Sequence, residues 1–244
     1  MKKIKSLLIL LFFFSGCISA NDLVDGIYYE INSKNKTAQV VGCIINSPEL
    51  IIPSNVTVSR KATSGAKIQV SYPVVAVSSL FSNKNITSIT LSRNIQSIVV
   101  SAFKGCESLH TIIVAEGNEN FMSEDGVLYN SSQTAIICCP VEKTEVSIPS
   151  SVNSINTSAF SKCKKIRQIN IPVSVTSIEG SAFEKCEELG SISIPNSVKN
   201  IGESAFRGCC SFTTLTIPNS VTTIGEYNQE IKGKTNVEII PVSA

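Results

Sequence analysis

The sequence predicts a repeat solenoid of the α/β type, mostly β, wound in coils of about 23 residues, a length within the range of leucine-rich repeats. The first observation is the phrase Ile-Pro-x-Ser-Val, or a close variant of it, which begins at constant intervals at Ile148, Ile171, Ile194 and Ile217. An unbroken period over these steps is typical of stacked structural repeats. The second is the composition, which has no tryptophan and only 6% aromatic residues and suits short strands and turns. The third is a pair of segments outside the regular copies that have the pattern of β-hairpins.

Each regular copy predicts one coil. The opening phrase is followed by Ser-Ala-Phe-x-x-Cys and then by an apolar set such as Leu189, Ile192 and Ile194, whose spacing fits a strand. Pro195 cannot donate to a β-ladder, so we expect it to close that strand. A single coil of this length cannot bury its own apolar side. The copies must therefore stack, with parallel strands about 4.8 Å apart.

The N-terminal segments predict an export signal and a cap. Residues 1–20 combine three early lysines, an apolar run over Leu7 to Phe14 and small residues, which is typical of a signal peptide. Two processing routes fit: cleavage after Ala20, or lipidation of Cys17 in the lipobox-like "FSGC". Either route predicts an extracytoplasmic protein, secreted or on the outer surface of a bacterium, that meets the membrane only through its signal or a lipid anchor. Residues 21–50 should form a hairpin cap, because a solenoid must cover its open core.

The rest of the chain divides into four expected segments. Residues 51–113 hold the first coils and include a diverged copy that begins at Leu91; an irregular coil with a polar loop is expected over 43–76. Residues 114–147 contain the same order of residue types as the N-terminal hairpin, which predicts a hairpin insertion. Regular repeats occupy 148–225, and 226–244 form either a closing cap or a truncated repeat. The repeat starts together predict about six coils.

The repeated phrase [IL]-P-x-S-V-x-x-I-x-x-S-A-F-x-x-C-x-x-L-x-x-I resembles the BspA-type, or Treponema pallidum-type, leucine-rich repeat. The match is good over Leu91 to Ile113 and Ile148 to Gly225, and loose over Ile52 to Thr90. The resemblance implies a leucine-rich repeat solenoid with a parallel concave sheet. It also implies adhesion to, or recognition of, a host or extracellular matrix protein or a glycan. The alternatives are a surface scaffold without a ligand of its own and, more remotely, a glycan-active enzyme.

The nine cysteines could form a metal site, disulfides, a nucleophile or part of a core. Their spacing of one per coil does not fit a zinc site, and parallel side-chain vectors disfavour disulfides. We therefore expect a buried ladder of thiols that act as small apolar residues, at Cys106, Cys163, Cys186 and Cys209. In the adjacent pairs Cys138–Cys139 and Cys209–Cys210 one thiol of each should be exposed. No metal or cofactor is expected.

The sequence also argues against catalysis and against nucleic-acid binding. His110 is the single histidine and lacks the partners of a catalytic triad, and Glu184, Glu187 and Glu188 fit a solvated charged face. We expect a protein that is not an enzyme. The 21 basic and 19 acidic residues nearly cancel, so the charge balance gives no indication of the clustered basic face that nucleic-acid binding needs, and we expect no nucleic-acid partner.

The outward strand positions are the candidate binding site. They are polar, small and nearly uncharged, and solenoids bind ligands along such surfaces. The candidate residues are His110, Thr111, Arg167, Gln168, Asn170, Ser191, Ser193, Thr213, Thr214 and Thr216. A rival site would use exposed hairpin tyrosines, Tyr28 or Tyr29 together with Tyr129. We expect a monomer.

Overall fold

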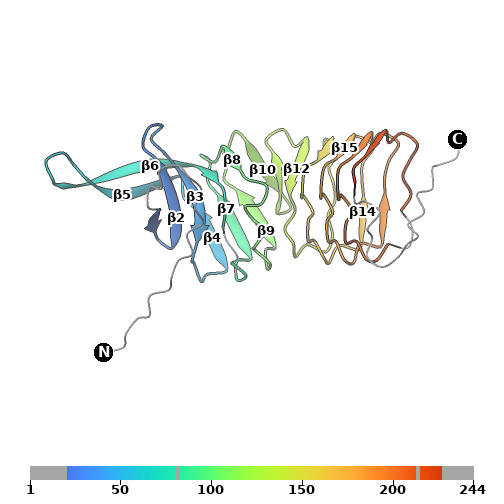
Figure 1. Ribbon diagram of the computed structural model, residues 1–244, viewed down its shortest axis with the longest axis horizontal. Coiled ribbons are helices and arrows are strands. Elements are labelled where there is room, and N and C mark those ends of the chain that lie inside the picture. Colours follow the sequence, from blue (N-terminus) through green and yellow to red (C-terminus); the bar gives the residue numbers. More distant parts are fainter. Residues whose placement is uncertain (1–20, 81–82, 213–214, 227–244) are drawn as a thin grey trace, which may run out of the picture.

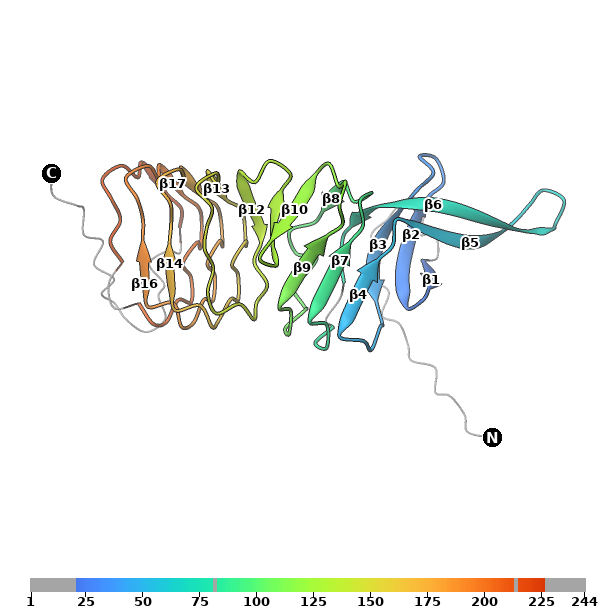
Figure 2. The ribbon, with the colours of Figure 1, turned by 180° about the vertical axis from the view of Figure 1, so that it is seen from behind.

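The computed structural model describes residues 21–80, 83–212 and 215–226. These residues form strands joined by turns, stacked into an elongated solenoid (Figures 1 and 2). The expected signal peptide with Cys17, the candidate site residues Thr213 and Thr214, and nearly all of the expected C-terminal segment lie outside the described residues. Within the described ranges no helix has the length and apolar character needed to cross a membrane.

The N-terminal end is a small antiparallel unit. Strand β1 (Asp22–Val24) pairs with β2 (Ile27–Asn32), which forms a hairpin with β3 (Thr37–Cys43). Strand β2 alternates buried and more exposed side chains, so its inward positions pack over the end of the first coil. This hairpin is the one that the sequence predicts.

The segment expected to be irregular instead forms a long hairpin. Strand β5 (Asn55–Lys61) pairs antiparallel with β6 (Lys67–Val77), and the pair projects from the solenoid (Figures 1 and 2). A short turn joins the strands, in which the amide of Ala62 donates to the carbonyl of Ala66 and Gly65 has a left-handed φ of 80°. The Ser/Gly/Lys-rich loop lies where it was expected, as a tight turn. The expected irregular coil was wrong for the residues on either side of it, which form β5 and β6.

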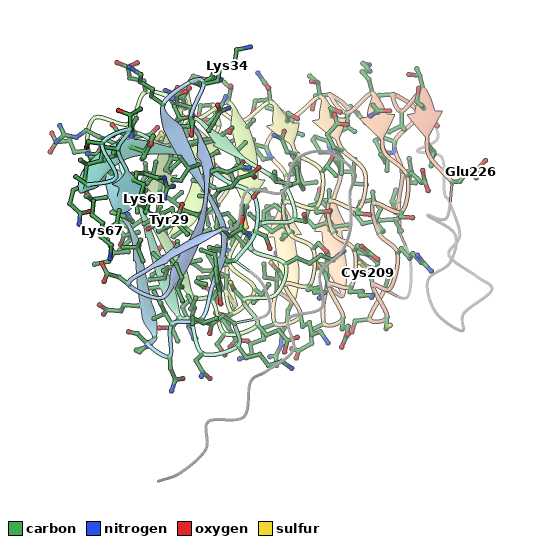
Figure 3. All side chains as sticks on the ribbon, turned by 60° about the vertical axis from the view of Figure 1, so that its left-hand side comes forward. Tyr29, Lys34, Lys61, Lys67, Cys209 and Glu226 are labelled. Atoms are coloured by element: carbon green, nitrogen blue, oxygen red, sulfur yellow. The ribbon has the colours of Figure 1, made fainter. Side chains whose placement is uncertain are left out.

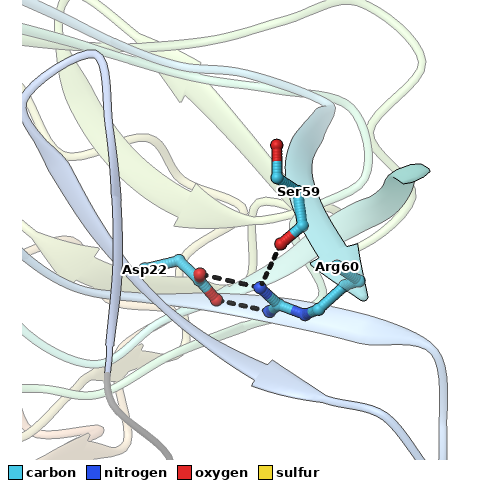
Figure 4. A network of polar contacts seen from close by, with 3 residues as sticks. All are labelled: Asp22, Ser59 and Arg60. Carbon is cyan, nitrogen blue, oxygen red and sulfur yellow. Dashed lines mark hydrogen bonds and ion pairs between the residues drawn. The ribbon is translucent and has the colours of Figure 1, made fainter. Parts of the chain in front are cut away.

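An ion pair fixes this hairpin to the first strand. The guanidinium of Arg60 donates to both carboxylate oxygens of Asp22 at 2.9 and 2.5 Å, and also to the carbonyl of Ser59 (Figure 4). A two-point arrangement of this kind restricts orientation as well as distance. The charged pair therefore aligns β5 with β1.

The coils carry parallel strands on two sides. One side holds β4 (Glu49–Ile52), β7 (Ser88–Leu91) and β9 (Thr111–Val114), followed further along by β14 (Gln168–Asn170) and β16 (Ser191–Ser193). The other side holds β8 (Ser97–Ile98), β13 (Ser154–Ile155), β15 (Ser177–Ile178), β17 (Asn200–Ile201) and β18 (Thr223–Ile224). Ser154 pairs with Ser177, and Ser177 with Asn200, so the register advances by one repeat length at each coil. This constant step confirms the solenoid.

The insertion is a small sheet that lies between two apolar cores. It consists of β10 (Phe121–Glu124), β11 (Val127–Asn130) and β12 (Ala135–Cys138), which pair antiparallel, and β12 then starts the parallel ladder with β13. In β11, Val127 and Tyr129 face the C-terminal core, whereas Leu128 faces the N-terminal core. Because both faces of β11 are buried, the insertion joins the halves of the molecule.

Hydrogen bonds between coils explain the repeated phrase. The serine of Ile-Pro-x-Ser-Val donates its hydroxyl to the valine carbonyl of the preceding coil: Ser174 to Val152 at 2.6 Å and Ser197 to Val175 at 2.7 Å. At the Ser-Ala-Phe corner the amide of Phe160 donates to the carbonyl of Ala182 in the next coil at 2.7 Å. These contacts lock neighbouring coils in a single register.

The phenylalanines of these corners stack inside the solenoid. Phe160 and Phe183 have ring centroids 5.0 Å apart and planes at 15°, and Phe183 and Phe206 have centroids 5.5 Å apart and planes at 2°. All three side chains are buried. Each ring therefore contributes apolar burial and contact with its neighbours in the stack.

The repeat cysteines are buried, as predicted, and also act as hydrogen-bond donors. The thiols of Cys186 and Cys209 donate to the carbonyls of Phe160 and Phe183, both at 3.1 Å. Cys209 lies inside the stack, whereas Lys34 lies at the tip of the N-terminal hairpin (Figure 3). Cys209 is buried and Cys210 is exposed, as expected for that pair. The expectation is wrong for Cys138–Cys139, because Cys139 is buried and Cys138 is half-buried against the N-terminal core.

The thiols inside the solenoid are poor nucleophiles. Burial raises the pKa of Cys106 to about 12. A hydrogen bond with Cys139, and then burial, raise the pKa of Cys163 well above its ordinary value, and a hydrogen bond with Cys209, and then burial, have the same effect on the pKa of Cys186. Since the thiolate is the reactive form, these groups should stay inert at neutral pH.

Replacing the central ring of the stack should strongly destabilise the solenoid. Phe183→Ala removes a fully buried ring and both of its stacking contacts, so the free energy of unfolding should fall by about 3–5 kcal/mol in urea titrations. Phe183→Leu is the matched control and should cost clearly less, because it retains most of the apolar volume. Equal losses for the two variants would contradict this account of the stack.

Thiol labelling of the native protein should distinguish exposed from buried cysteines. With iodoacetamide at neutral pH and peptide mapping by mass spectrometry, Cys210 should react first among the described thiols and Cys138 more slowly. Cys163 and Cys186 should react only after denaturation. Labelling of Cys163 at the rate of Cys210 would show that the ladder is not buried.

Candidate binding face

The best-formed part of the candidate site is a polar strip on β14 and β16. The strip consists of Gln168, Asn170, Ser191 and Ser193, whose side chains are all exposed. The register pairs Gln168 with Ser191 and Asn170 with Ser193, so the four side chains form two rows across neighbouring coils. The intervening isoleucines face the core. Strand alternation thus presents amide and hydroxyl groups to solvent from a fixed backbone.

Arg167 borders the strip at the start of β14. Its Nε donates to a carboxylate oxygen of Glu188 at 3.1 Å, and 83% of its side chain is exposed. An ion pair this exposed is worth little, so the guanidinium remains able to turn to a ligand. Thr216 is exposed one coil further along.

His110 and Thr111 lie at a different sheet, and the insertion covers its edge. The amide of Ile112 donates to the carbonyl of Gly126 at 2.9 Å, and the amide of Val114 donates to the hydroxyl of Ser123 at 3.0 Å. Gly126 has a left-handed φ of 74°, and a Cβ there would come within 2.6 Å of the hydroxyl of Thr111. The candidate residues are therefore divided between two surfaces.

A groove of about 590 Å³ opens beside β14, in the gap between the sheet β4-β7-β9 and the sheet β14-β16. One wall is the segment from Glu145 to Ile148, and the other is β14 with Gln168 and Asn170. Among the described residues no backbone hydrogen bond links residues 145–148 to β14. The groove thus extends the polar strip sideways. Sequence reasoning missed it, although the break in the regular period just before Ile148 marked the place.

The rival site built on exposed tyrosines is wrong. Tyr29 and Tyr129 are only 1% and 2% exposed, and Tyr28 is half-buried. Burial, with smaller contributions from neighbouring acidic groups, raises the pKa of both buried phenols to about 12. The hairpins turn these two rings toward the two cores, so they stabilise the fold.

The charged residues weighed for catalysis lie on the surface. The Nδ1 atom of His110 is 2.7 Å from the carbonyl oxygen of Ser108, and its Nε2 atom is 3.9 Å from the carboxylate of Glu142. Glu187 pairs with Lys164 at 2.8 Å. Across the described ranges no three His, Cys, Asp or Glu side chains gather in a way that could hold a metal ion.

Three solved structures show a related fold. A leucine-rich repeat protein from Eubacterium ventriosum ATCC 27560 is 27% identical, with a TM-score of 0.55, over 63% of this chain and 40% of that protein. The pneumococcal vaccine antigen PcpA is 17% identical, with a TM-score of 0.54, over 85% of this chain and 78% of that protein. A leucine-rich cell surface protein from Faecalibacterium prausnitzii A2-165 is 18% identical, with a TM-score of 0.52, over 86% of both chains. At these identities the last two support the fold alone.

The sequence comparison assigns the family. This chain spans well under half of the Eubacterium ventriosum protein, and no curated protein sequence matches it. The family model for the BspA-type leucine-rich repeat region matches residues 76–141 and 132–240, with six copies. Since that match covers more than half of the chain, the protein belongs to the BspA-type leucine-rich repeat family.

Proposed function

We propose that this protein is exported to the outer surface of a bacterium and there binds a host or extracellular matrix protein, as an adhesion or recognition module without catalytic activity. The polar strip and the groove beside it are the proposed contact surface. The observation that carries the proposal is the exposure of Gln168, Asn170, Ser191 and Ser193 on a rigid two-stranded sheet next to the groove.

The chemistry of this surface suits an extended protein segment. Side-chain amides and hydroxyls donate and accept hydrogen bonds, and their two rows repeat at the spacing of the strands. Arg167 adds a residue type that is frequent at interface hot spots. A small polar surface gives modest affinity, so display of many copies on a cell would supply the adhesion.

Membership of the family supports the proposal in general terms. Related folds include a protein described as a leucine-rich cell surface protein. The predicted signal peptide, with cleavage after Ala20 or lipidation at Cys17, would bring this chain to the same location. Repeat solenoids commonly bind their partners along an extended strand surface.

The proposal is tested by an array of matrix and host-cell proteins probed with the purified protein. We expect saturable binding to at least one of them, which Gln168→Arg and Ser191→Arg should each weaken by about tenfold or more, as expected for interface hot spots. Thr176→Arg is the matched control, because Thr176 is exposed beside the strands of the opposite side, and it should leave binding unchanged.

Two results would contradict the proposal. Binding that is indifferent to both strip substitutions would place the contact surface elsewhere. No saturable binding to any protein on the array would favour a surface scaffold without a ligand of its own.

A further inference from the structure

The coil that contains the insertion is too short at its corner. In a regular coil the chain runs from the inner strand isoleucine through the Ser-Ala-Phe corner to the next Ile-Pro, as from Ile155 to Ile171. Ile136 occupies the place of Ile155 in the ladder, but the path from Ile136 to the Ile-Pro at Ile148 is shorter. Cys139 takes the place of Phe160, because its amide donates to the carbonyl of Ala159 at 2.7 Å as that of Phe160 donates to Ala182. The chain is shorter than a regular coil on both sides of Cys139.

The short corner leaves a cavity of about 240 Å³, here called the corner notch. Its apolar lining is formed by Val99, Val100, Phe103, Leu109, Cys138 and Val141. Val99 and Val100 are 51% and 53% exposed, so apolar surface reaches the opening. Cavities for small organic ligands are usually larger, about 300–1,000 Å³, so this volume suits a single inserted side chain.

The corner beside the notch also lacks its partner coil. In the regular array the amides of Ser158, Phe160 and Lys162 donate to carbonyls of the next coil at 2.7–3.0 Å. The corresponding amides are those of Ser101, Phe103 and Gly105, which donate no backbone hydrogen bond within the described part of the chain. Ser101 and Gly105 also do not take the left-handed backbone of their counterparts Ser158 and Lys162. This corner therefore has backbone donors available to a new partner.

The rim of the notch is positively charged. Lys104 and Lys162 both line it, and neither forms an ion pair within the described residues. Glu107 lies near enough for Lys162 to lower its pKa, but the first and largest cause of that shift is its hydrogen bond with Lys84, which lies 3.0 Å away. Two unpaired cations beside apolar surface favour an occupant that carries negative charge next to an apolar group.

We propose that the corner notch binds an extended acidic peptide segment of a partner protein. One aromatic or branched side chain of the segment fills the cavity. Its backbone carbonyls accept hydrogen bonds from the free amides of the 101–105 corner, as the next coil does elsewhere, and its flanking carboxylates face Lys104 and Lys162. The site is separate from the polar strip and does not depend on the function proposed for it.

The probes are synthetic peptides of sequence Glu-Asp-Phe-Asp-Glu, with controls in which the central residue is Ala or the acidic residues are Lys. Binding of the labelled peptide to the purified protein is followed by fluorescence anisotropy. The Phe peptide should bind at least tenfold more tightly than either control. Lys104→Glu and Lys162→Glu, both on the rim, should each weaken it at least tenfold, whereas Lys199→Glu and the strip variant Gln168→Arg should not change it.

A second measurement locates the contact without any variant. In amide NMR spectra of the purified protein, the Phe peptide should shift the signals of Ser101, Phe103 and Gly105. Equal affinity for the Phe and Ala peptides, or shifts confined to other coils, would overturn the proposal. Binding of decanoate in the absence of peptide binding would also overturn it, because the notch would then be a site for an acyl chain.

Discussion

The whole structure depends on the fact that one short coil cannot bury its own apolar side. Each copy must therefore rest on the next, and the parallel registers advance by one repeat length per coil to make this possible. The stacked phenylalanines, the serine hydroxyls and the thiols all act across the same interface between coils. The repeated rings, hydroxyls and thiols thus have partners in a neighbouring coil. The outward strand positions take no part in these contacts.

The insertion shows what happens where that rule is broken. Its strand β11 buries Val127 and Tyr129 in one core and Leu128 in the other, so the chain stays continuous across the interruption. The effect is confined to two places. Backbone pairing is interrupted beside β14, where the groove opens, and at the 101–105 corner, where the notch opens. The groove and the corner notch therefore both arise from the same insertion, which interrupts the repeat period. Repeat proteins often place their binding features where insertions occur.

Periodicity predicted the stacked coils, the two hairpins that resemble each other and the buried cysteines, because those features follow from spacing alone. It also predicted that Gln168, Asn170, Ser191 and Ser193 would point outward. It could not predict the β5–β6 hairpin, because a Gly-containing polar stretch fits a loose loop and a tight turn equally well. It misplaced Tyr29 and Tyr129, because exposure in a hairpin depends on what packs against it. The positions of the groove and the notch follow from the register of β12 against β13. That register could not be inferred from the sequence, because the insertion interrupts the period just before it.

The central claim is that the described coils pair through their corners, as Phe160 does with Ala182 and Cys139 with Ala159, but that the corner at 101–105 does not pair with the insertion. Amide hydrogen exchange of the native protein tests this claim most directly. Phe160, Phe183 and Phe103 are all buried. Within the described ranges the first two amides donate to a neighbouring coil, at 2.7 and 2.8 Å, and that of Phe103 does not. The account predicts that the amide of Phe103 exchanges more than about 100-fold faster than those of Phe160 and Phe183. Equal protection of the three amides would contradict it, because the corner at Phe103 would then already be paired.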